Sequence, residues 1–80
     1  MVALEWMDKI IASDPNNSGS YYDQACLLSR MGKFDEAVVA LRTAFEKGYR
    51  AFAHIENDND MDGIRNRPDF IALIQEYKKK

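Results

Sequence analysis

Two consecutive helix-period patterns between Tyr21 and Gly48 are the feature that most constrains the fold of this 80-residue chain. In the second pattern, apolar residues recur every three or four positions, which places on one helical stripe Phe34, Ala37, Val38, Leu41, Ala44 and Phe45. In the first pattern, Tyr21, Ala25 and Leu28 share a face. Gly32 between the patterns can adopt the left-handed conformation that ends a helix, so we expect an antiparallel helical hairpin.

Several residues of this hairpin resemble the tetratricopeptide repeat, a helix-turn-helix unit of about 34 residues. In the first helix the matching positions are the opening aromatic residue Tyr21, the small residue Ala25 and the large residue Leu28. Gly32 matches the turn glycine, and Ala37 and Leu41 match a pair four residues apart in the second helix. Gln24 departs from the family pattern, in which Leu is usual. The resemblance implies one full repeat over residues 17–48. Gly48-Tyr49 replaces the closing proline, which indicates that a repeat array ends here.

The residues before the hairpin fit the same repeat shifted by one period. Pro15 falls where a closing proline belongs, Ala3 where the second helix has its small residue, and Met7 and Ile10 on the buried stripe. The resemblance therefore implies that residues 2–13 are the second helix of a partial repeat. We expect one all-α domain over residues 1–80, part of a larger protein: antiparallel helix hairpins in a right-handed superhelical stack, followed at 49–80 by short turns and a C-terminal capping helix.

Composition argues against several other classes. A hydrophobic content of 46% argues against disorder, and the lack of alternating runs argues against strands. A formal net charge of −2 gives no electrostatic reason to bind nucleic acid. No apolar run reaches the roughly 18 residues of a membrane helix, no secretory signal is visible, and the single cysteine, Cys26, excludes an internal disulfide framework. We therefore expect a soluble, cytoplasmic protein, unless a signal upstream of Met1 is missing from this sequence.

The resemblance implies a concave face on the first hairpin helix, where such repeats bind a protein or peptide partner. The predicted partner-binding residues on this helix are Tyr22, Asp23, Cys26, Ser29 and Arg30. Tyr22 and Arg30 are residue types enriched at interface hot spots, so they are the best candidates for contact. The alternative is that Tyr22 packs on the C-terminal elements and that Arg30 is a solvated charge.

The first helix carries more apolar surface than the hairpin alone can cover. Trp6, Met7 and Ile10 form an apolar strip that the missing upstream helix would shield in an intact array. An exposed strip of this kind favours self-association, so we expect these residues to mediate a homodimer. The alternative is that Trp6 folds back onto the hairpin core, because large aromatic residues are usually mostly buried.

Residues 58–69 resemble the start of a calcium-binding loop. Four carboxylates fall at the first, third, fifth and twelfth positions of an EF-hand pattern: Asp58, Asp60, Asp62 and Asp69. Gly63 stands where that loop turns sharply. The chemistry is imperfect, because Arg65 replaces a hydrophobic residue and Asp is shorter than the usual final Glu. The alternative, typical of the end of bacterial repeat arrays, is that the aspartates cap short turns and the chain binds no metal or cofactor.

The last helix is predicted to begin near Pro68, which suits a first turn, and to end in a lysine-rich tail. Its apolar residues form one stripe at helical spacing: Phe70, Leu73, Ile74 and Tyr77. We expect this helix to dock on the hairpin as a lid, with Met61 and Ile64 packing inward from the preceding turns.

The sequence offers little for catalysis. Cys26 and His54 are the one candidate nucleophile and base, and no residue is placed to orient the histidine. Zinc, P-loop and nucleotide-binding spacings are absent. We therefore predict a non-enzyme that serves as a protein-protein interaction module or scaffold. Two other functions stay open: a calcium-binding module, and a passive structural appendage of an enzyme domain upstream of Met1.

Overall fold

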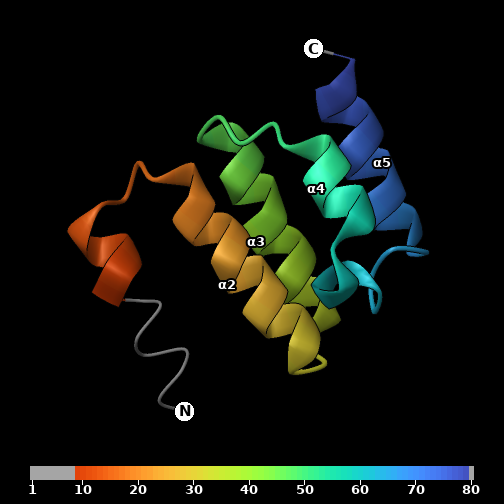
Figure 1. Cartoon of the computed structure of the whole chain (residues 1–80), viewed down its shortest axis with the longest axis horizontal. Helices are drawn as coiled ribbons and strands as arrows, with labels where there is room; N and C mark the ends of the chain where they lie inside the picture. The colour runs from red at the N-terminus through yellow and green to blue at the C-terminus, as the bar shows by residue number, and fades with distance from the viewer. Residues whose placement is uncertain (1–8, 80) are drawn as a thin grey trace.

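A computed structural model describes residues 9–79 of the chain (Figure 1). Within this range all regular elements are helical. They are a short helix at 9–13, α2 (Ser18–Arg30), α3 (Phe34–Glu46), α4 (Phe52–Asn57), the 3-10 helix η1 (Asn59–Met61) and α5 (Pro68–Lys78). The predicted all-α fold built on a helical hairpin is confirmed.

The predicted hairpin is formed by α2 and α3, which lie side by side. α2 begins after Asn17, whose side chain accepts a hydrogen bond of 3.0 Å from the backbone amide of Gly19. Gly32 has the left-handed φ of +80° that the sequence predicted. Beside it, the amide of Lys33 donates to the carbonyl of Leu28 at 2.9 Å, which closes the end of the helix.

Small residues bring the two helices of the hairpin close together. Ala25 of α2 and Ala37 and Ala44 of α3 are completely buried, and so are the larger Leu41 and Phe45. The rest of the predicted α3 stripe is buried as well, apart from a half-buried phenylalanine at its start. The hairpin is therefore held mainly by close apolar packing.

A second left-handed glycine, Gly48 with φ of +107°, ends α3. After it the chain passes to one side of the hairpin, so that α4 and α5 lie on one side of α2 and α3 while helix 9–13 lies on the other (Figure 1). Two rings of this C-terminal part pack against Phe45: Phe52 and Tyr77, with centroids 5.4 Å and 5.1 Å from it.

The last helix packs on α3 and buries the predicted stripe of Phe70, Leu73, Ile74 and Tyr77. Pro68 occupies its first turn, where a missing backbone N–H is not needed. Three residues between the start of α4 and the start of α5 are completely buried: Ile55, Met61 and Ile64. The C-terminal part thus extends the hairpin core and covers one side of it.

Candidate interaction surfaces

The α2 row that was predicted to bind a partner is divided between buried and exposed residues. Tyr22, Cys26 and Ser29 are 4%, 9% and 5% exposed, because η1 packs against this face of α2. Asp23 and Arg30 remain exposed. Partner contact by these five residues stays a prediction, and the buried three can reach a partner only if the C-terminal segment moves away.

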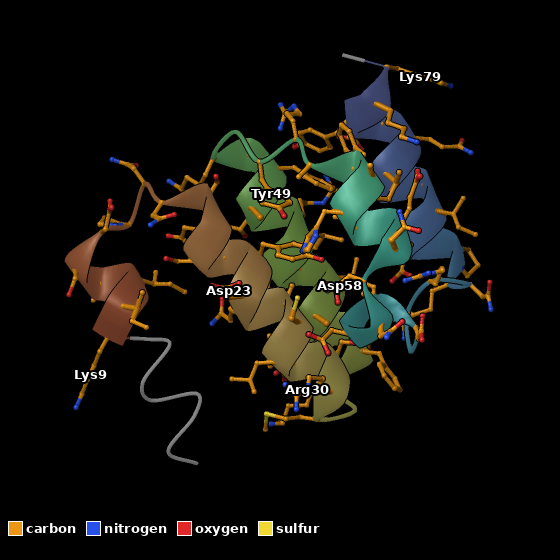
Figure 2. The ribbon with its side chains drawn as sticks, in the orientation of Figure 1. Lys9, Asp23, Arg30, Tyr49, Asp58 and Lys79 are labelled. Atoms are coloured by element: carbon orange, nitrogen blue, oxygen red, sulfur yellow. The ribbon has the colours of Figure 1, made fainter. Side chains whose placement is uncertain are left out.

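Asp58 connects the C-terminal segment to this buried row. Its Oδ2 accepts a hydrogen bond of 2.6 Å from the hydroxyl of Tyr22 and a weaker contact of 3.8 Å from the thiol of Cys26. Its Oδ1 accepts from the amide of Asp60 at 2.9 Å, which caps η1. Figure 2 shows Asp58 between η1 and α2, so one carboxylate both starts η1 and attaches it to the hairpin.

The protonation states in this cluster follow from burial and hydrogen bonding. Burial, together with the hydrogen bond to Asp58, raises the pKa of the Tyr22 hydroxyl. Burial also raises the pKa of the Cys26 thiol to about 12, and the charge of Asp58 acts in the same direction. For Asp58, partial burial favours a higher pKa, but the hydrogen bonds from Tyr22 and from the Asp60 amide outweigh it and hold the pKa below its ordinary value. At neutral pH the carboxylate is therefore ionised and both donors keep their protons.

The Cys26 thiol is poorly suited to act as a nucleophile. The potential ligand atoms of Cys26, Asp58 and Asp60 lie within 4.8 Å of one another. Nucleophilic attack requires the thiolate, and the raised pKa keeps the thiol protonated at neutral pH. His54 does not pair with the thiol, because its Nε2 lies 3.4 Å from Asp58 Oδ2. Cys26 and His54, the predicted pair, therefore both contact the carboxylate of Asp58.

Three rings form an aromatic patch beside Asp58, defined here as Tyr22, Tyr49 and His54. Tyr22 and Tyr49 are stacked, with centroids 4.6 Å apart and planes 12° from parallel. The centroid of His54 lies 5.5 Å from that of Tyr22, and its side chain is 62% exposed. The sequence did not predict Tyr49 and His54 as interaction residues, because they come from a loop and a short helix where no periodic pattern marks a face.

Arg65 holds together the loop that resembles a calcium site. Its guanidinium donates to the backbone carbonyls of Glu56 and Asp58, both at 2.6 Å, and lies 3.5 Å from that of Ile55. It also approaches the carboxylate of Asp62 at 3.3 Å. The positive charge of Arg65 therefore lies next to Asp62, one of the four predicted calcium ligands, which argues against a calcium ion there.

Two further residues of the calcium pattern have other roles. Gly63 does not adopt a left-handed conformation; a Cβ at this position would lie 2.6 Å from a ring carbon of Phe34, so close packing explains the glycine. Asp69 lies in the first turn of α5, where Arg67 donates to it at 3.0 Å and to Asp35 as well. These contacts favour the alternative of turn capping over the calcium hypothesis.

A groove between α2 and α3 is a second candidate surface, which we call the α2–α3 groove. It is lined by Tyr21, Gln24, Leu28, Asp35, Glu36, Val39, Ala40 and Thr43. Leu28 and Ala40 are buried, whereas Val39 is 65% exposed. The lining contains two carboxylates and no basic residue. The sequence pattern contained no sign of this groove, because Val39 lies outside the α3 stripe.

The residues predicted to mediate self-association are only partly described. Trp6 and Met7 lie outside residues 9–79, and Ile10, in the short helix, is half-buried. The homodimer stays a prediction. Across the part of the chain that the structure describes, the helices are too short and too polar to cross a membrane.

Comparison with known proteins gives two matches. Residues 6–39 match a family model described as "Tetratricopeptide repeat", and the match ends within α3. The chain is also similar to a protein from Arabidopsis thaliana that is described as chloroplastic, with 30% identity over 78 residues. That alignment covers 94% of this chain and 23% of the relative, so the chain spans less than a quarter of the relative's length. No solved structure matches the chain.

Proposed function

This chain carries a tetratricopeptide repeat, and on that premise we propose that it is a protein-protein interaction module, or part of a scaffold, within a longer protein. The observation that carries the proposal is the exposed edge of the aromatic patch, together with the exposed carboxylate of Asp23, which follows Tyr22 in α2. Amphipathic rings beside a solvent-exposed charge are typical of surfaces that bind peptides.

The proposed contact surface consists of Tyr49, His54 and Asp23. Tyr49 is half-buried by its stacking on Tyr22, so its orientation is fixed before any partner arrives. The negative charge of Asp23 is close enough to contribute to the raised pKa of the Tyr49 hydroxyl, for which burial is the main cause. Rigid rings lose little conformational entropy on binding, and an adjacent carboxylate selects a positively charged residue. The proposed partner is therefore a peptide segment with a basic residue beside an apolar one.

Selection from a randomised peptide display library tests this proposal without a known partner. We expect the full chain to enrich peptides that contain a basic residue, and the charge reversal Asp23→Lys to abolish their binding. Tyr49→Ala should weaken binding by at least about tenfold, because a ring at the centre of the contact is lost.

Glu36→Lys is the matched control, because it makes the same charge change in the α2–α3 groove. The control should leave binding of the selected peptides unchanged. Failure to enrich any peptide favours the passive structural appendage instead. Loss of binding only in Glu36→Lys places the partner in the groove and contradicts the proposed surface.

A further inference from the structure

We propose that Tyr49 and Asp23 recognise an arginine of the partner peptide in preference to a lysine. In this arrangement the guanidinium stacks on the ring of Tyr49 and donates two hydrogen bonds to the carboxylate of Asp23. The inference rests on the proposed function, because it names the basic residue that the proposed contact surface selects.

Asp23 has a carboxylate without a partner of its own. It is exposed, and within residues 9–79 its side chain forms neither an ion pair nor a hydrogen bond. Each arginine in this part of the chain already binds a carboxylate or a backbone carbonyl: Arg30, Arg42, Arg50, Arg65 and Arg67. An arginine that pairs with Asp23 therefore comes from another molecule.

Asp58, the other carboxylate at the aromatic patch, adds negative charge but is already bound. Its Oδ2 accepts from the hydroxyl of Tyr22, its Oδ1 accepts from the amide of Asp60, and its side chain is only 16% exposed. The charges of Asp23 and Asp58 both add to the effect of burial in raising the pKa of the Tyr49 hydroxyl. A cation on the Tyr49 ring is thus attracted by two carboxylates, while the hydrogen bonds are left to Asp23.

The ring of Tyr49 is held in place before a partner binds. Its backbone amide donates to the carbonyl of Ala44 at 3.0 Å, and its own carbonyl accepts from the guanidinium of Arg50 at 2.7 Å. Tyr22 covers one face of the ring at a centroid distance of 4.6 Å, yet Tyr49 is only half-buried. A fixed ring with exposed surface offers a stacking platform that costs little conformational entropy to use.

An exposed ring close to a free carboxylate suits a guanidinium better than an ammonium group. A guanidinium is planar, weakly hydrated and able to form two parallel hydrogen bonds with one carboxylate, whereas an ammonium group is a compact, strongly hydrated charge. The chain itself contains an arginine on a tyrosine ring, because the guanidinium carbon of Arg50 lies 5.1 Å from the centroid of Tyr77. The proposed surface therefore discriminates by the shape of the cation as well as by its charge.

Three short peptides that differ at one position test the inference. The first is acetyl-Gly-Leu-Arg-Leu-Gly-amide; the second has lysine and the third has uncharged, planar citrulline in place of arginine. Each is titrated into the full chain at one ionic strength, and NMR follows the amide signals of Asp23 and Tyr49. We expect the arginine peptide to bind roughly fivefold or more tightly than the lysine peptide, and the citrulline peptide to bind most weakly.

Two substitutions separate the roles of the ring and the carboxylate. Tyr49→Leu keeps an apolar side chain but removes the ring, so it should abolish most of the preference for arginine, whereas Tyr49→Phe should retain it. Asp23→Asn removes the charge and should weaken binding of both the arginine and the lysine peptide. Glu36→Gln, the same kind of change in the α2–α3 groove, is the matched control and should alter neither affinity. Circular dichroism should show equal helix content in all variants.

Equal binding of the arginine and lysine peptides to the unmodified chain would overturn the inference and leave the proposed function standing. A preference for arginine that survives Tyr49→Leu would overturn the role of the ring. Absence of binding by all three peptides would overturn the inference alone if the display selection enriches other sequences. If that selection enriches none, the proposed function fails as well.

Discussion

The α2–α3 hairpin and the segment from α4 to the start of α5 both contain completely buried apolar side chains, but they hold them in place by different means. The hairpin packs apolar side chains at regular helical spacing, with alanines where the helices touch. The later segment has only two short helical pieces, and its shape depends on Asp58 and Arg65, which bind the backbone or residues distant in sequence. The comparison shows that a repeat-like core can be extended by polar side chains that substitute for regular helix-to-helix packing.

A substitution that leaves a cavity in the hairpin core should have the largest effect on stability. Leu41 is completely buried between α2 and α3, so Leu41→Ala should lower the free energy of unfolding by about 2–5 kcal/mol. For an 80-residue domain this approaches the whole stability. Thermal denaturation should show both regions unfolding together. Val39→Ala, at an exposed site of the same helix, should change the melting temperature little.

Replacement of Arg65 should destabilise the C-terminal segment and leave the hairpin stable. Arg65→Met removes its charged hydrogen bonds to the carbonyls of Glu56 and Asp58, each worth about 1.5–3 kcal/mol, in a segment with few regular backbone bonds. Hydrogen exchange should accelerate in α4 and η1 while α2 and α3 stay protected.

Arg65→Lys serves as the control for charge, because a lysine cannot form the same fork of hydrogen bonds. It should rescue only part of the protection. Equal acceleration throughout the chain would show that the two regions do not differ in the way described.

Alkaline pH should weaken the contact between the regions. The pKa of Cys26 is raised to about 12 in the folded chain, against about 8.5 for an unfolded cysteine. The folded state therefore holds its proton more tightly, and the stabilisation present below pH ~8.5 is lost as pH rises, by about 1.4 kcal/mol per unit. Urea denaturation at several pH values measures this slope. In Cys26→Ala the slope just above pH ~8.5 should become shallower, and an unchanged slope would contradict the assignment.

The smallest effect is expected at Ser29. Its side-chain oxygen is buried and has no hydrogen-bond partner among the residues that the structure describes. Ser29→Ala removes this unsatisfied group and adds a better helix former, so stability should rise by about 0.5 kcal/mol or more. Ser18→Ala, at the half-buried start of α2, provides the comparison. A loss of stability in Ser29→Ala would show that the hydroxyl has a partner.

The sequence predicted the hairpin well because helical spacing and glycine conformation are local properties. The stripe on α3 and the turn at Gly32 needed no knowledge of distant residues. The same spacing placed Tyr22 and Cys26 on one face, but it contained no information about what covers that face. Asp58 lies 36 residues from Tyr22 in the chain, and no periodic pattern relates them.

The calcium hypothesis rests on a local motif whose residues also have structural explanations in the folded chain. Gly63 follows alternate aspartates, as a turn glycine does in a calcium loop, yet it is explained by the ring of Phe34, which packs against it. Arg65 was noted only as a departure from that motif, whereas it is the residue that organises the loop. Both structural explanations come from contacts that only the folded chain creates.

The contacts of Arg65 also bear on how the C-terminal segment can change during evolution. Arg65 binds main-chain oxygens, and every amino acid supplies such an oxygen. Side chains at exposed positions such as Glu56 can therefore drift while the attachment persists. Divergent relatives would then share the shape of this segment and an arginine at one position, with little other similarity between them.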